Sequence, residues 1–237
     1  MKIINEDSYL GILNVVIILL FTSSAFLQKK SLATTLSSVD DKWYGKEFFP
    51  IDLTKTLTYN STFGDLELKV TKDKNSNLFS YDSEKFKYRQ KLFIDEKGLF
   101  VNETYQKLKL LLFITKEGNY VYDKPLLRVP FPVKIGQEWR WYGKEFIDGK
   151  THIVSLKGKA TKVEAITTPA GKFETLKVET TLETSEGSKN KLMEWYAKDL
   201  GMVKMHVSIE GGGMLGFARD ILGYGNIEFE LKEISSQ

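Results

Sequence analysis

The sequence predicts an all-β protein, and three observations support this fold class. From residue 55 onward, apolar and polar residues alternate with the period of two that is typical of half-buried strands. Turn residues interrupt the alternation at the spacing of antiparallel all-β proteins. Aromatic residues make up 13% of the chain, and they suit pleated, half-buried surfaces. We expect an antiparallel curved sheet, in the form of a half-barrel or a sandwich, preceded by an N-terminal hydrophobic segment.

The expected strands are separated by short turns that contain Gly, Asp or Pro, of which Gly64-Asp65, Asp148-Gly149 and Pro169-Ala170-Gly171 are the clearest. Apolar residues on one face define each strand between these turns. In chain order, the expected strands contain residues 57–63, 66–70, 86–94, 99–101, 108–114, 139–141, 152–156, 176–182, 192–196, 203–209 and 227–231.

Composition limits the classes of protein to consider. The chain has 237 residues, of which 42% are hydrophobic, enough for one large β domain or two small coupled ones. The net charge is +3, and Lys and Glu are interleaved as on the solvated face of a sheet, without the basic stripe that a nucleic-acid partner requires. The absence of cysteine excludes disulfides, thiol catalysis, iron–sulfur clusters and cysteine-based zinc sites.

Residues 1–27 are predicted to be a signal peptide or a membrane anchor. The stretch YLGILNVVIILLFTSSAFL is apolar, and either Ser23 with Ala25 or Ser31 with Ala33 fits a cleavage site. The same stretch is long enough to span a bilayer, and a buried core helix is a third interpretation. Residues 28–42 are Ser/Thr-rich and are expected to tether this segment to the domain. We therefore expect an extracytoplasmic location, in the periplasm or secreted, with membrane proximity through the N-terminal segment. Without a cysteine to carry lipid, we do not expect a lipoprotein.

An internal repeat divides the expected β domain into two units. Phe131 lies 82 residues after Phe49, each followed by proline, and Trp141 lies 82 residues after Tyr59. We interpret residues 43–130 and 131–237 as two similar β-units that close around a shared surface. The alternative is a coincidence among strand-rich segments.

Three motifs occur in order in the second unit: FPVKIGQEW (131–139), TTPAGKFETLKVE (167–179) and EWYAKDLGMVK (194–204). With these motifs the chain resembles a family of exported bacterial proteins of unknown function that carry FPxKxGxxW, PAGxFxxxKVE and EWYAxxxGxVK. The resemblance implies an envelope location and a curved antiparallel sheet similar to lipoprotein-carrier half-barrels. It implies no reaction, catalytic residue or ligand.

No catalytic, metal or cofactor site is expected. The two histidines, His152 and His206, are far apart in the sequence, and no Gly-x-Ser-x-Gly elbow is present. Residues 211–216 match Gly-x-Gly-x-x-Gly, but too few residues follow for a dinucleotide-binding fold.

Four residues are predicted to contact an apolar ligand. Trp139 and Trp141 are two positions apart and so share a strand face, while Met214 and Phe217 lie in the glycine-flanked segment 210–225. One interpretation of this segment is a lid fixed on the sheet, and the other is a mobile apolar plug. The same aromatic residues also have an interpretation as ordinary core.

The sequence favours a non-enzymatic envelope protein that binds a lipid, another apolar ligand or a protein partner on its curved sheet. A structural or assembly component of the envelope is the alternative. A hydrolase with an unrecognised pair of carboxylates is a third hypothesis. An apolar concavity would favour the first of these, an exposed apolar outer patch the second, and two facing carboxylates in a cleft the third.

Overall fold

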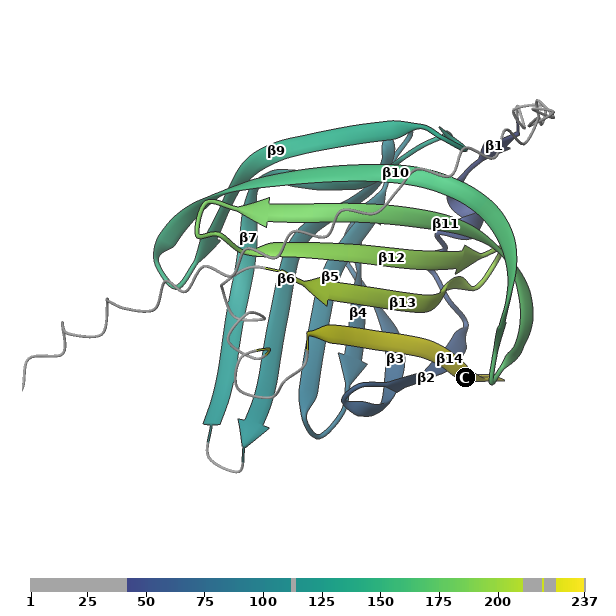
Figure 1. The fold of residues 1–237 in the computed structure, drawn as a ribbon, viewed down its shortest axis with the longest axis horizontal. Coiled ribbons are helices and arrows are strands. Elements are labelled where there is room, and N and C mark those ends of the chain that lie inside the picture. The colour runs from purple at the N-terminus through teal and green to yellow at the C-terminus, as the bar shows by residue number, and fades with distance from the viewer. Residues whose placement is uncertain (1–41, 112–113, 211–218, 220–224, 237) are drawn as a thin grey trace, which may run out of the picture. The chain divides into compact units, whose positions relative to one another are not determined.

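The computed structural model describes residues 42–111, 114–210, 219 and 225–236. Almost all of these residues belong to antiparallel strands (Figure 1), so the predicted all-β class is confirmed. The elements are β1 (Trp43–Tyr44), the 3-10 helix η1 (Lys46–Phe48), β2 (Lys55–Ser61), β3 (Gly64–Asp73), β4 (Ser76–Asp82), β5 (Phe86–Ile94), β6 (Gly98–Leu111), β7 (Ile114–Pro130), β8 (Val133–Lys134), β9 (Glu138–Ile147), β10 (Lys150–Thr168), β11 (Gly171–Thr184), β12 (Lys189–Ala197), β13 (Gly201–Ile209) and β14 (Asn226–Ser236).

Within the described residues, twelve strands form one closed barrel, whereas the sequence predicted a half-barrel or a sandwich. The order around the barrel is β10-β11-β12-β13-β14-β2-β3-β4-β5-β6-β7-β9, and β9 returns to β10. Two pairings between non-consecutive strands close it: β14 with β2, and β7 with β9. The prediction of a half-barrel or a sandwich was wrong because alternation along each strand does not show which distant strands pair with each other.

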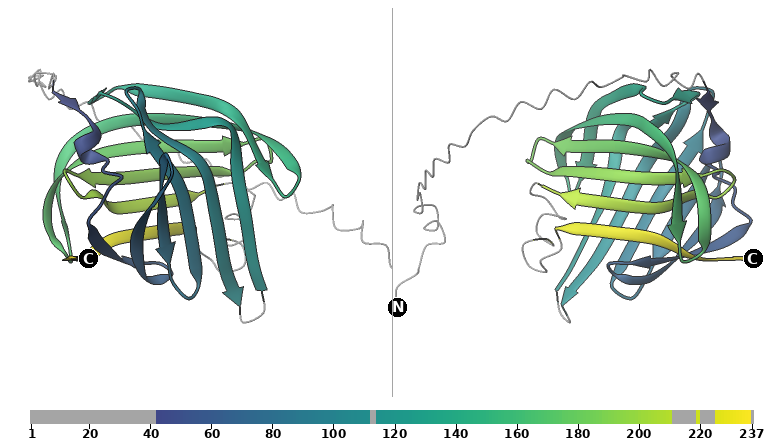
Figure 2. Two further views of the ribbon diagram at one scale, coloured as in Figure 1. Left: turned by 180° about the vertical axis from the view of Figure 1, so that it is seen from behind. Right: turned by 45° about the vertical axis from the view of Figure 1, so that its right-hand side comes forward.

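The barrel has two differently oriented walls. In Figure 1, β11–β14 run across the front, while β3–β7 run steeply behind them. Figure 2 shows β2–β7 side by side when the barrel is seen from behind. The long strand β10 bends between them, and its register with β11 shifts between Ala160 and Lys162. Such bulges allow a strand to curve from one wall to the next.

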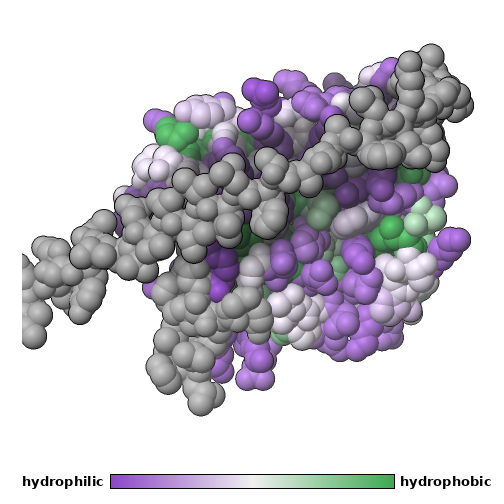
Figure 3. Space-filling model, viewed as in Figure 1, coloured by the Kyte–Doolittle hydropathy of each residue, from purple (hydrophilic) through white to green (hydrophobic). Residues whose placement is uncertain are grey.

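Alternation along the strands separates an apolar interior from a charged exterior. In β9, the residues at 139, 141, 143 and 145 are buried, whereas those at 138, 140, 142 and 144 are exposed. The two-residue turn Asp148-Gly149 places both residues at positive φ, as the tightest hairpins require, and the predicted turn is confirmed. On the front wall, the outer surface is mostly hydrophilic (Figure 3).

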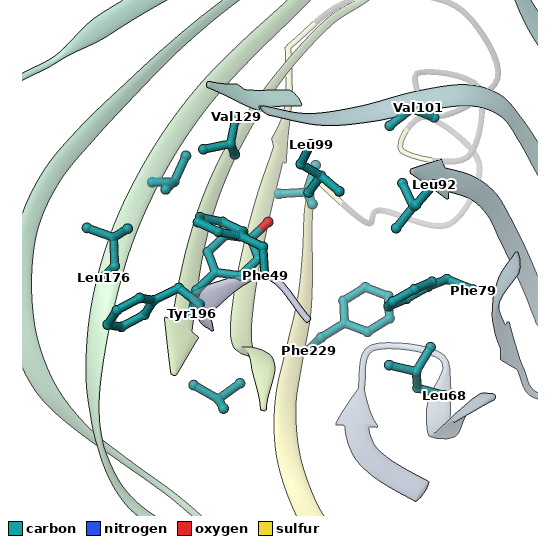
Figure 4. Close-up of a cluster of buried hydrophobic side chains, with 14 of the residues drawn as sticks. Phe49, Leu68, Phe79, Leu92, Leu99, Val101, Val129, Leu176, Tyr196 and Phe229 are labelled. Atoms are coloured by element: carbon teal, nitrogen blue, oxygen red, sulfur yellow. The ribbon is translucent and has the colours of Figure 1, made fainter. Parts of the chain in front are cut away.

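Residues 42–54 cover one end of the barrel. The ring centroid of Phe49 lies 4.5 Å from that of Tyr196 and 5.4 Å from that of Phe131. Figure 4 shows Phe49 among side chains from both walls, including Leu99, Val129 and Phe229. The backbone of Asp199 donates a hydrogen bond to the carbonyl of Glu47 (2.7 Å). This covered end is therefore packed with aromatic side chains. We call the other end, at the turns 148–149 and 185–188, the open end.

The boundary between the two predicted β-units falls between β7 and β8. Residues 43–130 supply β1–β7, and residues 131–237 supply β8–β14. The two Phe-Pro pairs that mark the repeat meet through the contact of Phe49 with Phe131. The existence of two similar units stays a prediction. The predicted signal or anchor (1–27) and all of the tether (28–42) except Lys42 lie outside the described residues. No helix in the described part of the chain is both long enough and apolar enough to cross a membrane.

Candidate functional site

The barrel encloses a cavity of about 500 Å³. This volume lies within the range of small-molecule sites, about 300–1,000 Å³. Both walls line the cavity, mainly with aliphatic and aromatic side chains, as the inward positions of alternating strands should. The apolar lining includes Leu68, Phe79, Leu92, Leu156, Leu192 and Phe229.

A buried ion pair lies in the wall of this cavity. Arg128 of β7 donates to the carboxylate of Glu194 in β12, whose side chain is only 1% exposed. The second terminal nitrogen of Arg128, Nη1, donates to Gln90 Oε1 (2.7 Å) in β5. The three side chains therefore connect opposite walls of the barrel through charge-assisted hydrogen bonds.

The surroundings raise the pKa of Arg128 and of the tyrosines near it. Burial opposes the charge of Arg128, but attraction to Glu194 and to Tyr196, Tyr88 and Tyr81 together outweighs it, and the pKa of Arg128 is raised. Burial raises the pKa of Tyr88 to about 12 and also raises the pKa of Tyr81 and Tyr196. At neutral pH these phenols remain protonated and can donate hydrogen bonds.

The open end of the cavity contains a second buried carboxyl, that of Glu145 in β9, which is 5% exposed. Burial, followed by repulsion from Glu186, raises the pKa of Glu145 from its ordinary 4.5 to about 7. Its cross-strand neighbour in β10, His152, is also buried, with Nε2 2.9 Å from Glu186 Oε1. Glu145 has no cationic partner among the described residues.

The two predicted tryptophans lie outside the cavity lining, although both are described and both are buried. They bridge the junction between β7 and β9, where only two residue pairs are in register. Trp139 Nε1 donates to the carbonyl of Arg128 (3.0 Å), and Trp141 Nε1 donates to that of Pro125 (2.9 Å). The indoles thus close the barrel where backbone hydrogen bonds are sparse. Their contact with a ligand stays a prediction.

Each indole lies over a glycine. A Cβ atom at Gly158 would overlap the Trp139 ring, and one at Gly143 would overlap the Trp141 ring. The two glycines therefore provide the space that lets both rings reach β7. The other predicted ligand residues, Met214 and Phe217, lie outside the described residues, as does almost all of the predicted lid segment 210–225.

Sequence reasoning missed the polar residues of the cavity. Gln90, Arg128, Glu145 and Glu194 were not singled out, although a signal was present. Glu194 lies between Leu192 and Tyr196 on one strand face, and Gln90 lies between Tyr88 and Leu92 in the same way. A polar residue at an inward position of an apolar alternation indicates a buried polar site.

Within the described ranges, no three His, Asp or Glu side chains come together as a metal site requires. The cavity offers an apolar volume, one internally compensated ion pair, and hydrogen-bonding and carboxyl groups at one end.

The fold and site define an antiparallel β-barrel protein with an apolar internal cavity. Residues 54–215, more than half of the chain, match the family model described as DUF3108-like, and the chain belongs to this family. The prediction of a family without a characterised function is confirmed at this level. No curated protein matches the chain.

Two solved structures are similar to this chain. One is an inferred lipoprotein of Parabacteroides distasonis (14% identity, 79% of this chain and 98% of that chain covered, TM-score 0.38). The other is an inferred exported protein with a YmcC-like fold from Bacteroides fragilis (14% identity, the same coverage, TM-score 0.35). Both similarities are too low to carry an argument about function.

Proposed function

We propose that this protein is a non-enzymatic protein of the bacterial cell envelope that binds an apolar small molecule inside its barrel. The observation that carries the proposal is the apolar cavity of about 500 Å³. Barrels filled by their own side chains leave no such space, whereas ligand-binding barrels do. The N-terminal apolar segment and the resemblance to exported proteins support an envelope location.

The binding proposal is tested by occupying the cavity with a side chain. Leu182 of β11 lines the cavity, and the next residue, Thr181, does not. Full-length protein should bind an uncharged environment-sensitive dye such as Nile red. We expect Leu182→Trp to weaken dye binding by about tenfold or more, because the indole takes ligand volume.

Thr181→Trp is the matched control, because it adds the same ring to the outer wall of the same strand. It should bind the dye as the wild type does. Dye binding that is absent from the wild type, or equal in both variants, would contradict binding in the cavity. Native mass spectrometry of gently purified protein would then identify the co-purifying molecule.

The envelope location has its own test. After fractionation of cells that express the full chain, we expect the protein outside the cytoplasm. Its N-terminal sequence would show whether cleavage follows Ala25. Recovery of the intact chain from the cytoplasm would contradict this part of the proposal.

An apolar outer patch favours a second candidate function, that of an envelope assembly component. Tyr142, Phe146 and Ile153 are 62%, 43% and 36% exposed, and Val121 pairs directly with Phe146 across β7 and β9. Clustered apolar residues on an outer face are typical of protein contacts. If Tyr142→Lys with Phe146→Lys abolishes cross-linking to envelope proteins in cells but leaves dye binding intact, this second function is supported. Unchanged cross-linking would exclude this patch.

A further inference from the structure

The cavity is strongly asymmetric in polarity between its depth and its open end. Across β11 and β12, inward-facing neighbours in register are Val178 with Glu194, then Thr180 with Leu192, then Leu182 with Asn190. Beyond them, at the open end, Thr184, Glu186 and Ser188 line the cavity. Polar groups thus accumulate towards the turn 185–188, while the deeper charge of Glu194 is already compensated by Arg128.

Three polar atoms in this gradient are buried without a hydrogen-bond partner among the described residues. They are Thr180 Oγ1, Thr184 Oγ1 and Asn190 Oδ1, all on side chains that line the cavity, and Thr180 and Asn190 are 7% and 8% exposed. An unpartnered buried polar atom costs about 1–3 kcal/mol, so a partner supplied by a ligand would be favourable. The amide oxygen of Asn190 only accepts hydrogen bonds, and it therefore requires a donor.

The charged groups around these atoms are mainly acidic. Glu145, Asp148 and Glu186 line the open end, together with Glu117 and the cation Lys116. Glu117 is paired with Lys107 (2.9 Å), and His152 Nε2 lies 2.9 Å from Glu186 Oε1. No described residue donates a hydrogen bond to the carboxyl of Glu145, which is 5% exposed.

We propose that the ligand of the cavity is an amphiphile with a protonated amine at its polar end, which lies against Glu145 and Asn190 at the open end of the barrel. This inference rests on the proposed binding function and specifies the class of ligand. The apolar part of the ligand occupies the depth of the cavity, between Leu192 and Phe229. An ammonium group carries three donors and a positive charge, and therefore satisfies both the orphan oxygen and the carboxylates.

The same arrangement disfavours an anionic amphiphile. The cation in the depth, Arg128, is already paired with Glu194, so a ligand carboxylate placed there would face a buried like charge. At the open end it would face Glu145, Asp148 and Glu186. An uncharged alcohol could donate to Asn190 but would gain no attraction from the carboxylates.

The test compares three amphiphiles of equal chain length: dodecylamine, dodecanol and dodecanoate. Each displaces Nile red from the full-length protein at about pH 8, above the pKa of Glu145 and below that of the amine. We expect dodecylamine to displace the dye at a concentration about tenfold lower than dodecanoate. Glu145→Gln should remove most of this preference while leaving the affinity for dodecanol unchanged.

Glu186→Gln is a second variant, and it lies in an exposed turn, where a substitution does not disturb the core of the barrel. Like Glu145→Gln, it should reduce the preference for dodecylamine over dodecanoate. Glu183→Gln, on the outer face of β11, is the matched control and should retain the wild-type order of affinities. The inference is overturned if the wild type binds dodecanoate as tightly as dodecylamine or more tightly. It is also overturned if Glu145→Gln keeps the wild-type ratio of the affinities for dodecylamine and dodecanol. In either case the proposed function stands. Failure of the dye and of all three amphiphiles to bind overturns both.

Discussion

Two buried carboxylates line the same cavity but differ in the charged groups around them. Glu194 lies in the wall of the deep cavity, bonded to Arg128, which in turn bonds Gln90 on the opposite wall. Glu145 lies at the open end, with Glu186 as its charged neighbour and with a pKa raised to about 7. The first carboxylate is part of the structure that holds the walls together. The second is destabilised when it ionises, and such groups mark sites where a ligand supplies what the protein does not.

The largest expected effect follows from breaking the deep pair. Glu194→Ala leaves the Arg128 guanidinium buried without its counter-ion, and we expect the free energy of unfolding to fall by about 3–5 kcal/mol. Denaturant titration measures the loss. The double variant Arg128→Met with Glu194→Leu should recover most of it, because it removes both charges. A loss below about 1 kcal/mol for Glu194→Ala would show that the pair does not hold the walls together.

A smaller effect is expected from the residue that fixes the strand of Arg128. Trp139→Phe removes the N–H that bonds the carbonyl of Arg128 and leaves a void over Gly158. We expect a loss of about 1–3 kcal/mol in unfolding free energy. Trp195→Phe is the control, since its Nε1 bonds the carboxylate of Glu164 on the outer face (2.8 Å). Equal losses in the two variants would argue against a special role for the β7–β9 junction.

The smallest effect is a change in pH dependence at the open end. The folded-state pKa of Glu145 is raised, so protonation of Glu145 stabilises the fold. This stabilisation is complete below about pH 4.5 and is lost as the pH rises through about 7. His152, Asp148 and Glu186 are the ionisable neighbours. Wild-type stability should therefore fall by on the order of 1 kcal/mol between about pH 5 and 8.

Glu145→Gln removes the titrating group, and its stability should stay level over the same pH range relative to the wild type. Thermal unfolding at several pH values measures this difference. Glu183→Gln on the outer face should follow the wild-type curve. If Glu145→Gln follows it as well, then Glu145 does not ionise with the raised pKa.

The sequence was sufficient for local structure and insufficient for closure. Alternation placed Leu57, Trp139 and Leu176 on buried faces, and Asp148-Gly149 fixed a hairpin, because these features depend on neighbouring residues alone. The pairing of β14 with β2 depends on residues at opposite ends of the chain, and one sequence contains no signal for it.

The site was less predictable than the fold. Trp139 and Trp141 were predicted to contact a ligand because large aromatic residues occur both in protein cores and in ligand-binding sites. Their position over Gly158 and Gly143 became visible only when β9 and β10 were paired in register. The ion pair of Arg128 with Glu194 joins β7 to β12. Because these strands are distant in sequence, the sequence alone did not predict that the two residues would pair.

The position of β14 has a consequence for how this chain reaches its folded state. The hydrogen bond from the backbone of Glu228 to the hydroxyl of Thr62 spans 166 residues, and β14 comes last in chain order among the described barrel strands. Until it arrives, β2 and β13 each present an unpaired edge. Contacts of such high sequence separation form slowly. The barrel therefore completes only after the whole domain has left the ribosome, and a chaperone that covers these edges should increase the yield of folded protein.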